Sequence, residues 1–247
     1  MSQYVYGTTG LLHMPTADMQ YDKTFLVGCS FLEKHSTPSA WLYNTYNYYV
    51  NITIFPWMEV GYEMTLNKGM PGGYWPQPTW GRFVNQDRQF SVRLRVWKEG
   101  WWKGWPPQVV VGMNDALTMW SSKHQGSFNS PDDSKNGYWN RNFITLTKHF
   151  FCKNVGELGI HLAYVYNKRK DYPLNGPAIG TNFRFTLPGN QPFTKAINHL
   201  NLMAEYDSRT INLGAEYSFW KDYINVVIEF NRCRYFSGGL VFKVHLK

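Results

Sequence analysis

Residues 58–66 read Met-Glu-Val-Gly-Tyr-Glu-Met-Thr-Leu, so that apolar side chains alternate with polar or small ones. Residues 90–96 and 224–230 repeat the pattern. Alternate residues of a strand point to opposite faces, which gives each of these strands one apolar face and one polar, often charged face. A soluble sandwich is the less natural interpretation, and a membrane barrel with lipid outside and water inside fits better.

The same alternation recurs along the chain and predicts an all-β fold, a single antiparallel transmembrane β-barrel of about 12 strands. Short connections at 55–57, 207–209 and 220–222 are expected to alternate with long ones at 67–87, 115–140 and 167–178. Residues 1–22, with little alternation, are expected to form an N-terminal plug or loop segment, and residues 23–247 the barrel. The strands are expected near residues 23–31, 43–55, 57–67, 88–97, 107–114, 141–150, 156–166, 179–186, 199–207, 210–219, 223–231 and 238–246.

The composition suits a barrel in contact with lipid. Aromatic residues make up 18% of the chain, with 11 Trp and 17 Tyr, and charged residues only 17%. Tyr and Trp settle at membrane–water interfaces, and no stretch approaches the ~20 apolar residues of a spanning helix. The net charge of +8 favours anionic surfaces such as lipid headgroups or an acidic polysaccharide, while no recognition motif supports nucleic acid as a partner.

The sequence predicts no enzyme, no metal and no cofactor. Cys29, Cys152 and Cys233 are widely spaced, and the seven histidines lack the HExxH spacing of a zinc site. Glu59 and Glu63 lie four apart on one strand, about 13 Å at ~3.3 Å per residue, which is too far for a glycosidase pair. Carboxylates from other strands could close that gap, so a hydrolase stays an alternative.

Eight charged residues fall on the polar faces of their strands and are candidates to line the lumen. Their mixed signs predict ion pairs across a narrow lumen, since a buried charge needs a partner. Contact with a solute or a sugar chain is the alternative. These candidates are Glu59, Glu63, Arg93, Arg95, Glu205, Glu216, Glu229 and Lys243.

Four tryptophans cluster at Trp97, Trp101, Trp102 and Trp105, beside lysines. They suit either an interfacial girdle, which is favoured, or a platform for sugar rings. The basic run at residues 168–170 is a solvated loop or a contact for phosphates or an acidic glycan.

Several motifs, in order, resemble the YjbH-like proteins, outer-membrane β-barrels associated with exopolysaccharide and capsule production. The first is Gly-Leu-Leu-His-Met-Pro-Thr-Ala at residues 10–17, and the second is Asn-Ile-Thr at 51–53 with Pro-Trp-Met-Glu-Val at 56–60. A strand that starts near Pro107 and ends in Gly112-x-x-Asp115 is similar to a central strand. Residues 204–207, 212–214 and 238–240 resemble the closing strands. The resemblance implies glycan export or display and supplies no catalytic residues. The chain departs from the family in its size and in its end on Lys247, where many such barrels end on an aromatic residue.

The expected function is therefore an accessory role in exopolysaccharide or capsule export or surface organisation, in a bacterial outer membrane. Lipid, and an acidic polysaccharide or other envelope proteins, are the expected partners. A small-solute porin, a structural subunit of a larger complex and a soluble lipocalin-like binder are alternatives. Residues 1–3 show no signal peptide, so either the sequence begins after a cleavage point or the barrel interpretation is wrong.

Overall fold

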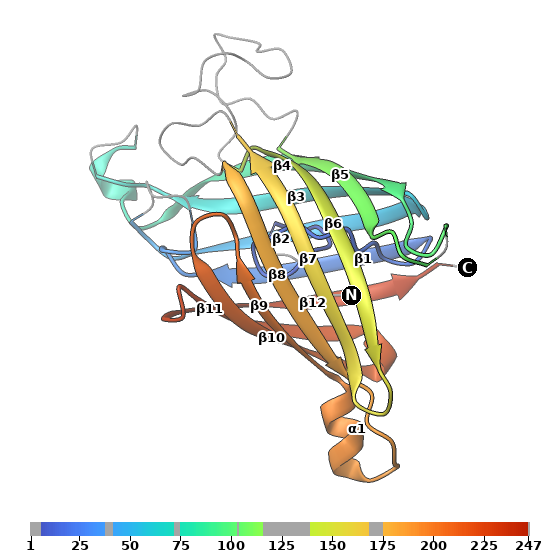
Figure 1. Ribbon diagram of the computed structural model, residues 1–247. Helices are drawn as coiled ribbons and strands as arrows, with labels where there is room; N and C mark the ends of the chain where they lie inside the picture. Colours follow the sequence, from blue (N-terminus) through green and yellow to red (C-terminus); the bar gives the residue numbers. More distant parts are fainter. Residues whose placement is uncertain are drawn as a thin grey trace.

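Twelve antiparallel strands form a closed barrel in the computed structural model, which describes residues 6–37, 42–71, 75–102, 104–115, 139–167 and 175–246 (Figure 1). Each strand pairs with its neighbours in sequence, and β1 pairs with β12 to close the ring. The strands are β1 (Thr24–Leu32), β2 (Thr45–Phe55), β3 (Met58–Lys68), β4 (Phe83–Trp97), β5 (Gln108–Asn114), β6 (Arg141–Cys152), β7 (Gly156–Tyr166), β8 (Gly176–Phe185), β9 (Leu200–Tyr206), β10 (Ile211–Phe219), β11 (Ile224–Asn231) and β12 (Tyr235–His245).

The predicted strands are confirmed, with differences at their ends. The largest is in β4, which begins at Phe83 because residues 83–87 continue the hairpin with β3, past an irregularity after Asn67, as far as the pair Lys68–Phe83. The sequence also did not predict α1 (Pro192–Asn198), which projects from one end of the barrel (Figure 1). Seven residues are too few to show a helical period, and Pro192 at the first turn is its main sequence signal. Two short 3₁₀ turns, η1 (Gln77–Thr79) and η2 (Trp220–Asp222), complete the elements.

The two ends of the barrel are called base and top. The base is the end where β1 begins and β12 ends, at the pair Thr24–His245. The expected alternation of short turns with long loops is wrong in three places. The short connection at 207–209 lies at the top, whereas the base carries two longer connections, at 98–107 and at 186–199 with α1. Strand pairing fixes the end at which a connection lies, and its length in the sequence does not.

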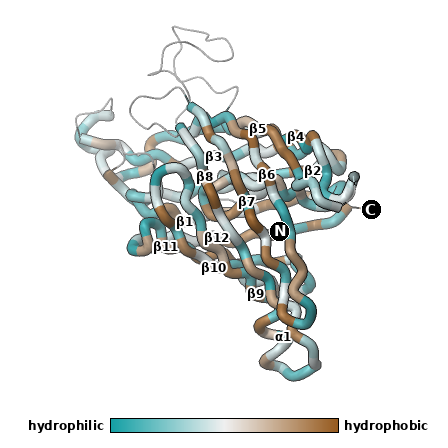
Figure 2. The backbone as a smooth tube through the Cα atoms, viewed as in Figure 1, coloured by the Kyte–Doolittle hydropathy of each residue, from teal (hydrophilic) through white to brown (hydrophobic). Residues whose placement is uncertain are grey.

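The apolar side chains of the strands face outward and the polar ones inward. Val60, Tyr62, Val92, Leu94, Val226 and Ile228 alternate with buried neighbours, most of which are polar, and none of the six is buried. Large apolar side chains therefore cover the outside, and apolar and polar residues alternate along the strands (Figure 2). An apolar exterior around a polar interior is the reverse of a soluble β-barrel and is the arrangement of a transmembrane one. Among the described residues, no helix is long and apolar enough to cross a membrane.

The N-terminal segment runs through the interior. Residues 6–20, called the plug here, form no strand, apart from a tight turn closed by an isolated bridge between Gly10 and Pro15. Leu11, Leu12 and Met14 are at most 1% exposed. Leu12 packs with Met203 and Val227 of the barrel wall, and Met14 with Val110 and Val165. The interior is thus a packed core of apolar plug side chains within a ring of mostly polar wall residues.

Glycines on the inner wall make room for large side chains. A Cβ added to Gly28 would lie 2.3 Å from Cζ of Tyr49, its partner on β2, and a Cβ on Gly112 would lie 2.4 Å from Cζ of Phe143. Others receive the plug, since a Cβ on Gly180 would lie 2.5 Å from Leu11 Cδ1. These positions need glycine for space, because the ring or the plug already occupies the volume of a methyl group.

We expect Gly28→Ala to lower the free energy of unfolding by about 1–3 kcal/mol, because the added methyl overlaps the Tyr49 ring. The temperature at which the detergent-folded barrel loses its compact band in electrophoresis measures the loss. Cys29→Ala, at the next and exposed position, is the control and should leave that temperature unchanged. Adding Tyr49→Leu should recover part of the loss; additive losses from the two changes would contradict the packing argument.

Candidate functional site

The candidate site is the plugged lumen, and its central contact is a carboxylate bound by the plug backbone. Glu205 of β9 is 3% exposed and accepts hydrogen bonds from three backbone N–H groups, those of Leu12 (3.0 Å), His13 (2.7 Å) and Met14 (3.1 Å). Asn212 of β10 donates to the same carboxylate at 3.0 Å. Convergent backbone N–H groups make an anion-binding concavity, and here a wall carboxylate occupies it.

A second carboxylate holds the plug on the opposite part of the wall. Glu59 of β3 accepts hydrogen bonds from the backbone N–H and the hydroxyl of Thr9, both at 2.8 Å. Arg93 of β4 pairs with Glu59 at 2.8 Å, and both side chains are fully buried. The Arg93 guanidinium also donates to the backbone carbonyls of Thr16 (2.5 Å) and Asp18 (2.9 Å). One buried ion pair thus satisfies both donors and acceptors of the plug.

Further wall residues bind the remaining plug backbone. Arg141 of β6 donates to the carbonyl of His13 at 2.8 Å, and its guanidinium lies 4.5 Å from the centre of the Tyr6 ring. Thr147 accepts from the N–H of Ala17 at 2.9 Å, and Gln108 donates to the carbonyl of the same residue. The wall therefore recognises mainly backbone groups, which every residue except proline offers in full.

His13 is the plug side chain that pairs with a wall charge near Glu205. Its Nε2 lies 2.7 Å from Glu229 of β11, with both side chains buried. Burial lowers the pKa of His13, but the charge and hydrogen-bonding capacity of Glu229, with Asp207 and Glu205 nearby, outweigh it and raise the pKa to about 9. His13 is therefore a cation at neutral pH and holds the plug to β11.

Toward the base, the plug ends in a network of charged groups. His149 of β6 lies 3.3 Å from Asp18 of the plug and 2.8 Å from Glu99 in the 98–107 connection. Burial would raise the pKa of Glu99, but hydrogen bonds from Lys148 and His149 outweigh it and lower the pKa. The network links the end of the plug to the tryptophan-rich connection.

The eight predicted lumen residues do not all meet the plug. Glu59, Arg93, Glu205 and Glu229 do, as described above. Glu63 accepts a hydrogen bond from Asn47 of the wall, and its other carboxylate oxygen lies beside the plug, 3.2 Å from the position that a Cβ on Gly7 would take. Lys243 pairs with Asp222 at 2.7 Å and lies 4.0 Å from Glu216. Arg95 is half-buried.

Sequence reasoning missed the partners in the plug and several neutral wall residues. His13 of the plug binds Glu229 of the wall. Asn51, Gln108 and Arg141 of the wall bind the plug backbone, and nothing in their own pattern separates them from other inward polar residues. The sequence did offer one signal for such partners. The inner face carries more polar side chains than its charges can pair with one another.

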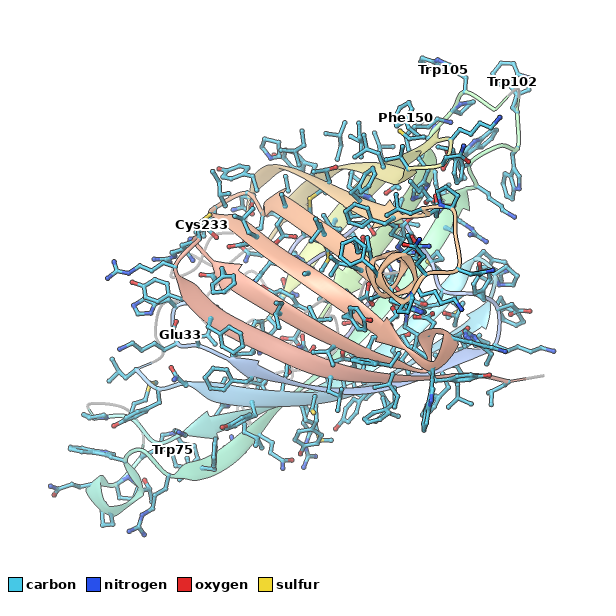
Figure 3. The ribbon with its side chains drawn as sticks, turned by 90° about the horizontal axis from the view of Figure 1, so that it is seen from below. Glu33, Trp75, Trp102, Trp105, Phe150 and Cys233 are labelled. Atoms are coloured by element: carbon cyan, nitrogen blue, oxygen red, sulfur yellow. The ribbon has the colours of Figure 1, made fainter. Side chains whose placement is uncertain are left out.

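The tryptophan cluster lies at the base, in and beside the 98–107 connection. Trp101, Trp102 and Trp105 are 63%, 62% and 81% exposed, and Trp102 and Trp105 lie at the opposite end of the molecule from Trp75 (Figure 3). Trp97 is half-buried and packs edge-to-face on Trp101 at 5.6 Å. Such exposure suits both a membrane interface and a contact with sugar rings or protein. The basic run at 168–170 lies outside the described residues.

In the described part of the chain, no group of three or more His, Cys, Asp or Glu side chains is arranged to hold a metal ion.

The apolar exterior and polar, plugged interior define a transmembrane-type β-barrel closed by its own N-terminal segment. A comparison with known families then gives a match to the model described as exopolysaccharide biosynthesis protein YbjH, over residues 2–121. This match confirms the resemblance to the YjbH family, and it contains the plug and β1–β5. The matched segment is just under half of this chain.

Other comparisons add little. No curated protein matches the chain. Among solved structures, the alcaligin outer membrane receptor FauA from Bordetella pertussis is similar at 13% sequence identity and a TM-score of 0.25. The match covers 82% of this chain and 37% of that one, so the chain spans little more than a third of that receptor's length.

We expect Glu205→Ala to loosen the plug, because three backbone N–H groups lose their acceptor and each hydrogen bond to a charged group contributes about 1.5–3 kcal/mol. In planar bilayers the unmodified barrel should stay closed, and the variant should show openings at least about ten times more often. Asp22→Ala, which removes an exposed carboxylate just outside the plug, is the matched control. Equal conductance of the three proteins would contradict the role of Glu205.

The plug should also loosen at high pH. Because the pKa of His13 is raised from about 6.5 to about 9, its contribution is complete below pH 6.5 and is lost as the pH rises through 9. Openings of the barrel should therefore increase between pH 7 and pH 10. The increase should be smaller in His13→Gln and should vanish in His13→Gln combined with His149→Gln, which also removes the histidine that pairs with Asp18 of the plug. A pH response that persists in the double variant would assign it to another group.

Proposed function

We propose that this protein is an outer-membrane barrel with an accessory, non-enzymatic role in the export or surface organisation of exopolysaccharide. The observation that carries the proposal is the combination of a lipid-compatible exterior with a lumen filled by the protein's own plug. The family match associates the chain with exopolysaccharide, and the fold suits a bacterial outer membrane.

The plug decides what kind of role the barrel suits. Plug side chains fill the centre of the lumen, and buried wall charges hold its backbone. A polysaccharide has no free path through a barrel in that state. The proposed role is therefore to organise the polymer at the membrane, or to pass it only after the plug moves.

The proposed partners follow from charge and exposure. A net charge of +8 favours an acidic polysaccharide and the phosphates of outer-membrane lipid. Outward Phe, Tyr and Trp side chains suit lipid chains and their headgroup boundary.

A second candidate function is a structural subunit of a larger outer-membrane complex. The projecting helix α1 and the exposed Trp101, Trp102 and Trp105 favour it, because both lie at the base and offer apolar area outside the strands (Figures 1 and 3). Phe193 of α1 is 71% exposed.

Deletion of the gene from its source bacterium tests the proposal. We expect the exopolysaccharide recovered from the cell surface to fall at least about two-fold, with sugar precursors unchanged, and the protein to fractionate with the outer membrane. A plasmid copy should restore the polymer. Unchanged polymer in the deletion strain would refute the exopolysaccharide role, and fractionation with the soluble proteins would refute the membrane location.

The two candidate functions differ in their response to Trp105→Ala combined with Phe193→Ala. A subunit of a complex should lose co-purifying proteins when these side chains are truncated, while the barrel itself stays folded. A barrel that acts without such partners should support normal polymer levels with both changes in place.

A further inference from the structure

The outer faces of the strands carry three charged side chains, and all three are cations. The structure describes all twelve strands in full, and along them every Asp and Glu falls on the inward face. Lys68 of β3, Arg88 of β4 and Lys148 of β6 fall on the outward face, in step with apolar neighbours such as Leu66 and Phe90. A charge that faces lipid is unfavourable in the middle of a bilayer and tolerated near its boundaries. The three cations therefore indicate where their strands leave the hydrocarbon.

The cation toward the base is neutralised by the protein, and the two toward the top are not. Lys148 Nζ lies 2.8 Å from Glu99 Oε1. Lys68 Nζ instead lies 4.8 Å from the centre of the Phe83 ring, and within the described residues neither Lys68 nor Arg88 has an acidic partner. The acidic residues of β2 to β5 all face inward. Two cations toward the top are thus open to an anion from outside the protein.

Arg88 lies at the level where a membrane boundary is expected. The stretch of β4 from Arg88 to Trp97 has ten residues, and a tilted strand crosses a bilayer with about 9–11. On the base side of Arg88 the outward side chains are aromatic, since Phe90 packs on Tyr62 with ring centres 4.7 Å apart. Such rings suit acyl chains, and an arginine beside them extends its guanidinium toward the headgroups. This surface therefore matches a lipid, with an anionic headgroup at Arg88 and acyl chains at the rings.

Lys68 lies further from the hydrocarbon than Arg88. Arg88 pairs with Met64 of β3, and Lys68 comes four residues after Met64, which is about 13 Å along the strand at ~3.3 Å per residue. With a strand tilt of about 35–45°, this is roughly 10 Å along the membrane normal. The headgroup layer of an ordinary bilayer is only about 5–8 Å thick on each side. A lipid that reaches both cations therefore needs a headgroup taller than a single phosphate ester.

Aromatic side chains surround Lys68 at that height. Its Nζ also lies 5.9 Å from the centre of the Tyr43 ring, and Phe83 and Trp80 are 47% and 38% exposed. Lys68 and Phe83 belong to the hairpin of β3 and β4, which extends from the top of the barrel and has Trp75 near its end (Figures 1 and 3). Exposed rings offer flat apolar faces beside polar groups, which suits sugar rings that carry an anionic group.

We propose that Lys68 and Arg88 bind the phosphates of a phosphorylated glycolipid, whose sugar rings lie beside Phe83 and Trp80 and whose acyl chains lie along Phe90. The inference rests on the proposed outer-membrane location, and it adds that the top of the barrel lies in the leaflet that holds this lipid. The two cations without an acid select an anion, and the rings on the base side of Arg88 select a lipid over a free anion. The height of Lys68 selects a sugar headgroup over a simple phospholipid.

Titration of the detergent-folded barrel with lipopolysaccharide that lacks its outer sugar chain tests the site, with the tryptophan fluorescence of the barrel as the signal. We expect saturable binding, and Lys68→Gln combined with Arg88→Gln should weaken it at least ten-fold. The matched control is Lys23→Gln combined with Lys153→Gln, which removes two exposed cations at the base and the same net charge. Equal binding by the two double variants would overturn the proposal.

Three further ligands separate the sources of the phosphate. Dephosphorylated lipopolysaccharide and phosphatidylglycerol should each bind at least ten-fold more weakly, and excess inorganic phosphate should not displace the glycolipid. Undiminished binding after dephosphorylation would leave only apolar contacts. Equal binding of phosphatidylglycerol would assign the site to any anionic lipid, and displacement by phosphate would assign it to a free anion. Each of these three results would overturn the proposal.

A charge-conserving variant separates recognition of the anion from folding of the hairpin. Lys68→Arg combined with Arg88→Lys keeps both positive charges and should retain most of the binding. The electrophoretic shift of the barrel reports whether each variant is folded. Loss of binding in the folded charge-conserving variant would contradict recognition through the two charges.

Failure of this site and failure of the proposed function are distinguishable. If the glycolipid does not bind while deletion still lowers surface polymer and the protein fractionates with the outer membrane, only the lipid site is refuted. If the glycolipid binds while deletion leaves the polymer unchanged, the site stands and the exopolysaccharide role falls.

Discussion

Charged side chains inside the barrel need partners, and the rest of the structure depends on how this need is met. Burying a charge without a partner costs several kcal/mol. The lipid on the outer side of the wall supplies no water that could solvate such a charge. Glu59, Arg93 and Glu205 find these partners in the backbone of the plug. The plug in turn has no strand partner for its own N–H and C=O groups, so wall and plug satisfy each other.

This mutual dependence explains why the interior combines polar and apolar packing. Leu11, Leu12 and Met14 pack against small or apolar wall residues, while the backbone between them is bound by side chains. Gly180 supplies the space that such a close approach requires. A barrel held together only by its strand ladder would not need the wall to match the plug in this way, residue by residue. The match indicates that the closed state is the one for which the wall is built.

The molecule has two different ends. At the base, Asp18, His149 and Glu99 connect the plug to a tryptophan-rich connection that lies outside the strands. Toward the top, Gln89 and Glu63 lie buried opposite each other on neighbouring strands, and Asn47 donates a hydrogen bond to Glu63.

Much of the fold was predictable, because a strand with lipid on one side and polar contacts on the other must alternate, and the segment from Met58 to Leu66 does so without interruption. The same alternation assigned Glu59, Glu63 and Arg93 to the face opposite Val60 and Val92, and strand pairing places them there. Connections were less predictable: α1 is too short for a periodic signal, and the length of a loop carries no information about its end of the barrel.

The sequence by itself determined the strands, their two faces and the aromatic, lipid-compatible exterior, because these follow from a period of two within each segment. Only the tertiary structure decided what the inward charges do. Glu205 meets the turn around His13 across 192 residues of sequence, and Arg93 meets Thr16 across 77. No local pattern encodes such contacts, since the plug is recognised through backbone groups that nearly all sequences share.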